Sequence, residues 1–429
     1  MIPRRTTKIA AGYFAITLTS ILFLSCIRKD QGKEKNLPTN RVVIDWNEMT
    51  YTIANQHDHF YSFIGIRALT MTHIAIHDAL NAIDRKYRPY AFSGNEPNAD
   101  PTAACSQAAY EILMMVYPNR EDTIKSVLNA WMDSVPEGNA KTRGIALGKK
   151  SAQAILQLRE NDGHQANGDY TPMTKPGDYQ YTPEFEGYVW KPDFSQVLPF
   201  TLDSLTQFRS PLPPELNSDA YTASYNEVKL YGTNNSDVRD ADQTNFAHWW
   251  AEFAEHGWNR IGRITAAERN LSLWETARMF ALINMDIYDI YLVSFDSKYF
   301  YDTWRPYTAI RQGEQDGNPN TKGDPDWQPE MLTPPWPEYP SAHAAVGAGG
   351  AEIVKSVFGT PKVSFTMKST MALPESQMRS YRDLDSAAQD CADSRIMNGF
   401  HFRFATEEGM QQGRKVARHV VENFLQPVK

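Results

Sequence analysis

Cysteine is scarce in this chain of 429 residues, which contains only Cys26, Cys105 and Cys391. The three match no Cys-x-x-Cys pattern, so cysteine usage gives no support to a zinc site. A disulfide between Cys105 and Cys391 is compatible with an oxidising compartment. Their positions in the sequence do not show whether the two residues meet.

Long apolar runs and basic clusters are also missing beyond residue 26. No later stretch is long enough for a membrane span, which excludes a protein with several spans. The formal net charge is −8, and without basic clusters it argues against nucleic acid as a partner. We find no internal repeat, no series of β-hairpins and no alternation of strands with helices.

The sequence instead contains many amphipathic or alanine-rich helical patterns. We therefore predict an all-α fold of two helical bundles packed as one compact unit, with the functional site in the second. Helices are expected near 63–82, 102–117, 121–134, 138–160, 218–231, 264–300, 341–357 and 400–425. The long connection at 161–215, rich in Gly, Pro and aromatic residues, is expected to cover the site.

The amino terminus has the features of an export signal. Arg4, Arg5 and Lys8 precede the uncharged apolar stretch 9–24, and Cys26 follows Ser25. This order predicts a lipoprotein signal that is cut before Cys26 and leaves that cysteine acylated. An uncleaved membrane anchor is the alternative.

The chain is thereby divided into three parts. Residues 1–25 are the expected signal peptide, residues 26–44 the lipidated cysteine with a polar flexible tether, and residues 45–429 the helical domain. The protein is expected to be exported and lipid-anchored to the bacterial cell envelope, at the periplasmic or the outer-membrane surface.

Three short segments between residues 295 and 405 have residue types that suit a tetrahedral oxyanion. Lys298 and Arg305 are seven residues apart, which predicts one face of a helix. Arg395 adds a third cation. Cations in a partly buried pocket repel one another, so an anionic guest would satisfy all three.

The segment Pro-Ser-Ala-His adds uncharged donors. Ser341 and Ala342 fall in the first turn of a predicted helix, where free N–H groups and the helix dipole favour a phosphate-like group. His343 is expected at the rim. His401 follows Arg395 by six residues, which is the opposite face of a helix, so the helix must break near Asn398-Gly399.

In residue type and order, these segments resemble the vanadium-dependent haloperoxidases and the wider phosphatidic acid phosphatase type 2 superfamily. That signature is Lys-x6-Arg-Pro, then Pro-Ser-Gly-His, then Ser-Arg-x5-His. The resemblance also includes residues 67–83, 256–261, 277–311 and 399–417, which favour the bacterial haloperoxidase branch. It implies a vanadium haloperoxidase/acid phosphatase-like fold.

The resemblance implies vanadate or phosphate binding by Lys298, Arg305, Ser341, Ala342, Arg395 and His401. In a haloperoxidase with vanadate as cofactor, His401 would bond the vanadium, Lys298 would polarise the bound peroxide and His343 would be the acid–base residue. Hydrogen peroxide and a halide would then yield a hypohalous acid equivalent. In a phosphatase, His401 would be the nucleophile that forms a phosphohistidine.

Two positions depart from the family pattern. Ala342 replaces the glycine of Pro-Ser-Gly-His, and its methyl group either fits a helical first turn or narrows the anion site. Ala405 stands where relatives often have an aspartate that orients the second histidine. Glu407, Glu408 or a backbone carbonyl is expected to replace that aspartate.

Aromatic residues are expected to line the halide site. The resemblance places Trp336 and Phe295 there, with Trp304 as a third candidate, and aromatic walls favour iodide or bromide over chloride. Ordinary core packing is the alternative for all three. His73 and His77 have the spacing of metal ligands, but their apolar neighbours favour a structural helix.

Three functions therefore remain open from the sequence. A haloperoxidase with an unknown organic acceptor is favoured by the flanking segments. A periplasmic phosphatase would use the same pocket. A non-catalytic surface lipoprotein is disfavoured because all the predicted ligand and acid–base side chains are present.

Overall fold

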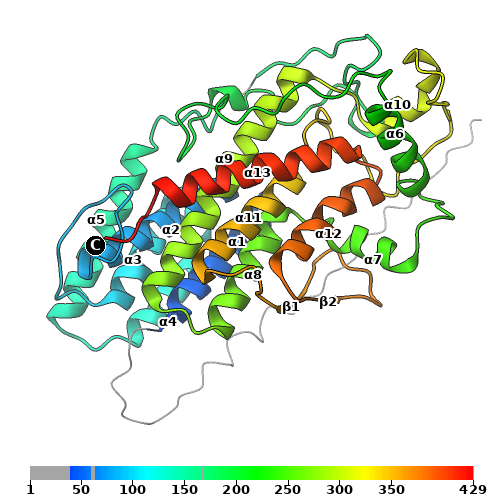
Figure 1. Cartoon of the computed structure of the whole chain (residues 1–429). Coiled ribbons are helices and arrows are strands. Elements are labelled where there is room, and N and C mark those ends of the chain that lie inside the picture. The colour runs from blue at the N-terminus through cyan, green and yellow to red at the C-terminus, as the bar shows by residue number, and fades with distance from the viewer. Residues whose placement is uncertain (1–38, 59–62, 167, 429) are drawn as a thin grey trace, which may run out of the picture. The chain divides into compact units, whose positions relative to one another are not determined.

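The computed structural model describes residues 39–58, 63–166 and 168–428, whose regular structure is almost entirely helical (Figure 1). The α-helices of this part are α1 (Arg41–Asp58), α2 (Ile64–Ile83), α3 (Pro101–Val116), α4 (Glu121–Asp133), α5 (Asn139–Leu158), α6 (Asp219–Tyr231), α7 (Ala241–Trp249), α8 (Ala254–Glu268), α9 (Leu273–Tyr301), α10 (Pro306–Arg311), α11 (Ala342–Phe358), α12 (Leu384–Met397) and α13 (Arg403–Asn423). Strands β1 (Phe365–Lys368) and β2 (Met378–Tyr381) form one antiparallel hairpin. The all-α prediction is confirmed.

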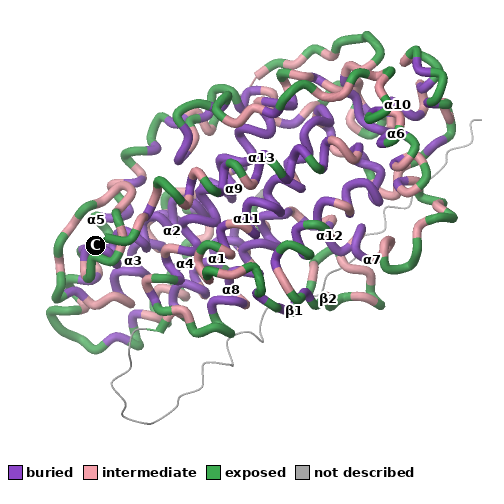
Figure 2. The backbone as a smooth tube through the Cα atoms, in the orientation of Figure 1, coloured by how far each residue is buried: buried purple, intermediate pink, exposed green. Residues whose placement is uncertain are grey.

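The helices form two bundles joined by α9. Helices α1 to α5 pack around α2 and α3, whereas α11 packs against α9, α12 and α13. Because α9 contacts α2 as well as α11, this helix of roughly 44 Å belongs to both cores. Figure 2 shows α9 and α11 buried over most of their length. The predicted pair of packed bundles is confirmed.

Some predicted boundaries are wrong. The single helix expected at 264–300 is two helices, because Asn270 has a left-handed backbone and Ser272 begins α9 with a capping box. Helix α1 begins at Arg41, and Val42 and Val43 are completely buried. Residues 41–44 thus belong to the folded domain, not to the predicted tether.

Close helix packing places the start of α11. A Cβ atom at Gly409 of α13 would lie 2.3 Å from the carbonyl oxygen of Ser341, so only glycine allows this approach. The Ser341 N–H also donates to the carbonyl of Ala405 at 2.9 Å. Helix α13 therefore holds the residue that begins α11.

Several predictions concern the rest of the chain. The signal peptide, Cys26 and most of the tether lie outside the described residues. Within the described ranges, no helix combines the length and apolar character that a membrane span requires. Cys105 and Cys391 are both buried free thiols, so the disulfide that the sequence left open is not formed.

The connection between α5 and α6 packs onto the helices through aromatic side chains. Its helical structure, over the residues described, consists of the short 3₁₀ turns η3 (Pro183–Phe185) and η4 (Phe194–Gln196). Phe194 is buried 5.0 Å from Phe295 between ring centroids. The Trp190 N–H donates to the carbonyl of Pro335 at 3.0 Å. This segment therefore covers part of the second bundle.

Candidate active site

Lys298 and Arg305 converge, but not for the predicted reason. Helix α9 ends at Tyr301, and Asp302 turns the chain with a φ of 50°, so no continuous helix connects the two cations. The Lys298 ammonium donates to the carbonyls of Pro337 at 3.0 Å and Glu338 at 2.6 Å. The loop that precedes α11 therefore binds the Lys298 ammonium group through two backbone carbonyls.

Arg305 lies against the same loop. Its Nε donates to the carbonyl of Trp336 at 2.8 Å, and its Nη1 donates to the carbonyl of Phe400 at 3.0 Å. Its Nη2 is buried and has no partner among the described residues. A buried guanidinium nitrogen without an acceptor indicates a guest that supplies one.

Arg395 and His401 meet because helix α12 breaks between them. Helix α12 ends at Met397, and Gly399 has a φ of +76°, which reverses the chain at the predicted position. Arg395 donates through Nη2 to the carbonyl of Trp250 at 2.7 Å. Its Nη1 donates to no described residue and remains available in the cavity.

The start of α11 supplies the uncharged donors. Ser341 is the N-cap residue, and its Oγ accepts from the N–H of Ala344 at 3.3 Å, which leaves the hydroxyl proton available. Ala342 is the first helical residue, so its methyl group fits a helical turn and lies in the cavity wall. His343 hydrogen-bonds the backbone of Trp250, and its Nε2 has no partner among the described residues.

Glu338 orients His401, a role that the sequence analysis missed. Its Oε1 lies 2.7 Å from Nδ1 of His401 and accepts from the N–H of Phe402 at 3.1 Å. Nε2 of His401 lies 3.1 Å from Nη1 of Arg305, which can only donate. The ring is therefore neutral with its proton on Nδ1, and Nε2 carries a lone pair.

The expected substitutes for the missing aspartate are thus incorrect, since neither Glu407 nor Glu408 makes this contact. The lone pair at Nε2 of His401 is what a bond to vanadium or an attack on phosphorus requires. Glu338 precedes the Pro-Ser-Ala-His segment by only two residues. It lies in a proline-rich loop, where no sequence motif identifies it as the residue that orients His401.

The charges of the site need a counter-ion. Burial, with Arg305 beside it, lowers the pKa of Lys298 well below its usual range, and burial lowers the pKa of Arg395 to about 10. Burial also raises the pKa of Glu338 to about 7, despite the two cations beside it. His401 has a strongly lowered pKa because it is buried among cations. Three cations against one carboxyl group leave an excess of positive charge that favours an anion.

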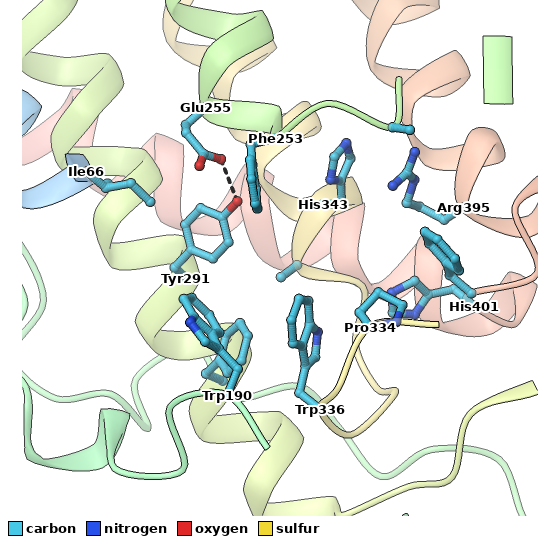
Figure 3. Close-up of a pocket in the computed structure, with 14 residues that line it drawn as sticks. Ile66, Trp190, Phe253, Glu255, Tyr291, Pro334, Trp336, His343, Arg395 and His401 are labelled. Carbon is cyan, nitrogen blue, oxygen red and sulfur yellow. Dashed lines mark hydrogen bonds between the residues drawn. The ribbon is translucent and has the colours of Figure 1, made fainter. Parts of the chain in front are cut away.

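Ala342, His343, Arg395 and His401 border a cavity of about 130 Å³, whereas Lys298, Arg305 and Ser341 lie outside its lining (Figure 3). A single water needs roughly 10–15 Å³ by such a measure, so a small oxyanion and a second small group fit. The cavity is lined by Ile66, Trp190, Ala251, Phe253, Glu255, Tyr291, Phe295, Pro334, Trp336, Ala342, His343, Arg395, Phe400 and His401. It therefore joins three of the predicted oxyanion residues, Ala342, Arg395 and His401, to aromatic walls.

The three aromatic candidates separate in the structure. Phe295 and Trp336 line the cavity with ring centroids 5.7 Å apart, and Trp190 packs on both. Trp304 instead packs with Tyr221 in a second hydrophobic cluster. The prediction of a halide-site role is thus incorrect for Trp304, whereas Trp190 was not predicted to line the cavity.

The cavity also contains a carboxyl group that the sequence did not mark. Glu255 accepts a hydrogen bond of 2.6 Å from the Tyr291 hydroxyl, and Phe253 lies beside this pair in the cavity lining (Figure 3). Burial raises the pKa of Glu255 to about 7. Its charge therefore changes near neutral pH, beside a site for anions.

His73 and His77 make hydrogen bonds within the helices of the first bundle. His73 lies 2.8 Å from the amide of Asn47, and His77 is paired with Asp78 at 3.0 Å within the first bundle. Over the described residues, no three His, Cys, Asp or Glu side chains gather as they would around a metal ion. The hydrogen bonds of His73 and His77 support the structural interpretation of that helix.

Comparison with known proteins adds to this geometry. Residues 278–429 match a family model described as the VCPO second helical-bundle domain. Vanadium chloroperoxidase of Curvularia inaequalis is 25% identical over 401 residues, which cover 74% of this chain and 64% of that protein. This chain thus spans less than two thirds of the length of that relative.

Solved structures share the fold. The crystal structure described as the first bacterial vanadium-dependent iodoperoxidase has a TM-score of 0.78 and 23% identity, with 92% of this chain and 100% of that one covered. A holo-type bacterial vanadium-dependent chloroperoxidase has a TM-score of 0.68 and 17% identity, with 84% and 91% covered. At these identities the likeness shows the fold.

Proposed function

We propose that this chain is a vanadium-dependent haloperoxidase, which oxidises a halide with hydrogen peroxide. The match of residues 278–429 to the family model and the shared fold support this proposal. The observation that carries the proposal is the buried Arg305 Nη2, which has no acceptor among the described residues, while Nη1 of the same guanidinium lies 3.1 Å from Nε2 of His401. A tetrahedral oxyanion supplies the acceptor and uses the lone pair of His401.

The donor set fits vanadate. Lys298, Arg305 and Arg395 would donate to its oxygens together with the hydroxyl of Ser341, and Nε2 of His401 would bond the metal. Bound there, vanadate would supply a Lewis acid that activates hydrogen peroxide toward a halide. Glu338 keeps the proton on Nδ1 of His401 and so keeps Nε2 unprotonated.

His343 is the proposed proton carrier. His343 lines the cavity, its Nε2 has no partner among the described residues, and burial together with Arg395 lowers the pKa of the ring well below its usual range. A neutral imidazole takes a proton from entering hydrogen peroxide and returns it to the departing oxygen. The backbone of Trp250 holds this ring and Arg395 in one place.

The cavity walls favour iodide or bromide. Trp190, Phe295 and Trp336 give the cavity a largely apolar aromatic wall. Dehydration of a small anion costs more free energy than dehydration of a large one, and aromatic walls offset little of this cost. Chloride is therefore expected to be the poorest of the three halides.

The test is a peroxide-dependent assay on purified protein that has been loaded with orthovanadate and desalted. Triiodide formation from iodide and bromination of a dimedone-type acceptor should both require vanadate, and inorganic phosphate should suppress them. His401→Ala should lower turnover by at least about 100-fold, the scale of losing a key transition-state contact. Arg418→Ala, which removes an exposed α13 cation, should leave turnover unchanged.

A phosphatase on the same pocket would give the opposite result. Hydrolysis of an aryl phosphate without vanadate, lost in His401→Ala, would replace the haloperoxidase assignment if no halide oxidation were found. Activity in neither assay would favour the non-catalytic alternative.

We also propose that the domain is exported and anchored through a lipid on Cys26, as the order of basic, apolar and small residues predicts. Metabolic labelling with a radioactive fatty acid should mark the protein. Cys26→Ser should abolish the label and prevent cleavage. Equal labelling of the two proteins would exclude acylation at this residue.

A further inference from the structure

A second hollow lies in the segment that covers the second bundle. Its volume is about 370 Å³, within the range typical of small-molecule sites. It is lined by Gly168, Asp169, Tyr170, Tyr181, Gly187, Tyr188, Val189, Trp190, Lys191, Pro192 and Asp193. The side chain of Tyr188 is 48% exposed, so solvent reaches one side of the hollow.

The hollow adjoins the active-site cavity through one residue. Trp190 lines both spaces, and its ring packs 4.9 Å from Phe295 and 5.4 Å from Trp336 between centroids. Figure 3 shows Trp190 beside Trp336 at the cavity. A small oxidised product that leaves the cavity past Trp190 would reach this hollow.

Four of the eleven residues that line the hollow are aromatic. Tyr170 and Tyr181 meet edge to face, with centroids 6.3 Å apart, and Tyr188 and Trp190 complete the set. The Tyr170 hydroxyl donates to Asp302 at 2.6 Å, which holds this ring in place. Such a wall favours a flat aromatic guest over an aliphatic one.

Asp193 defines the polar requirement. It is 2% exposed, and both carboxylate oxygens lack a hydrogen-bond partner among the described residues. Lys191 borders the same hollow, but its ammonium lies 3.4 Å from the carbonyl of Ala166. Leaving a buried carboxylate without a donor is costly, so the residue indicates a guest with an O–H or N–H group.

We propose that this hollow binds the organic acceptor, and that the acceptor is a single-ring phenol whose hydroxyl donates to Asp193. The assignment rests on the proposed haloperoxidase function. A hydroxyl bonded to a carboxylate enriches its ring in electrons. The ring carbon forms a bond to the halogen of the hypohalous acid, the halogen–oxygen bond breaks, and the displaced ring proton leaves with hydroxide as water. The ring is oxidised by two electrons and the halogen is reduced.

Binding is measured first, on the full-length protein without vanadate, peroxide or halide. Calorimetric titration with 4-cyanophenol should show binding, whereas its methyl ether, which lacks the donor, should bind roughly tenfold more weakly. Asp193→Asn should raise the Kd of the phenol by about tenfold and leave that of the ether unchanged. Asp203→Asn, in the same segment but exposed, should bind both like the unaltered protein.

Kinetic measurements then distinguish a failure of the acceptor site from a failure of the proposed haloperoxidase activity. In Asp193→Asn loaded with vanadate, the KM for the phenol should rise while triiodide formation from iodide stays the same. Equal affinity for the phenol and its ether in the unaltered protein would overturn the site without any variant. Unchanged phenol KM in Asp193→Asn would overturn it as well. Absence of triiodide formation in the unaltered protein would instead overturn the proposed function.

Discussion

Replacing Glu255 with glutamine should change how halide affinity depends on pH. The carboxyl group is 1% exposed in the cavity wall, and its hydrogen bond with Tyr291 can be kept by the glutamine amide oxygen. Burial raises its pKa to about 7, and the neighbouring charge of Glu252 acts in the same direction. Below pH 7 the group is therefore neutral, and above pH 7 it places a negative charge beside the halide.

The size of the effect follows from Coulomb's law. At an assumed separation of roughly 7 Å and an effective dielectric constant of about 20, two negative charges repel by about 2.4 kcal/mol. This repulsion exceeds the 1.4 kcal/mol or so that corresponds to a factor of ten, so a halide binds almost only to the protonated form. With a pKa of about 7 for Glu255, the KM for iodide should then rise roughly tenfold between pH 6 and pH 8.

The assay compares two proteins at each pH. Glu338 also has a pKa of about 7 and titrates in both, so the ratio of KM in the unaltered protein to KM in Glu255→Gln isolates Glu255. This ratio should be near one at pH 6 and about ten at pH 8. Glu408→Gln, a buried carboxyl on α13 outside the cavity lining, is the control and should keep the rise. A ratio that does not change with pH would refute the reasoning.

Three further outcomes are expected. Glu338→Ala should weaken vanadate binding by about 10–100-fold, measured by titration of activity, because His401 loses the partner that keeps its proton on Nδ1. Gly409→Ala should lower the free energy of unfolding by about 1–3 kcal/mol in denaturant titrations, since the new methyl group would overlap the backbone of α11. Cys105 and Cys391 should react with a thiol reagent only after unfolding, because both are fully buried. Wild-type affinity, unchanged stability or rapid labelling would contradict the respective prediction.

The features that could be predicted are those that depend on residues close together in the sequence. The helix at α11 follows from alanine and apolar residues at helical intervals, and the break after Met397 follows from a single glycine. Lys298 and Arg305 do meet, although the expected continuous helix is absent. The predicted ligand depended on the positive charge of these side chains, which favours an anion. The error about the continuous helix therefore did not change the predicted chemistry.

The cavity walls were harder to predict because their residues are distant in sequence. Trp190 reaches Phe295 from an irregular segment whose path no periodicity describes. Glu255 and Tyr291 are 36 residues apart on different helices, and each alone is typical of an ordinary buried side chain. Only the packing of α8 against α9 turns them into a titratable pair at an anion site.

The loop before α11 explains why the main orienting residue was missed. Its backbone carbonyls at Trp336, Pro337 and Glu338 accept hydrogen bonds from Arg305 and Lys298. Every residue has a backbone carbonyl group, whatever its side chain. Hydrogen bonds from the cations to these carbonyls therefore cannot be predicted from residue types. With the loop held there, Glu338 Oε1 contacts the ring of His401 and the backbone N–H of Phe402, both of which follow Gly399. The same short segment therefore places two cations and sets the tautomer of His401, which makes the loop's conformation, rather than any one ligand, the feature on which the site depends.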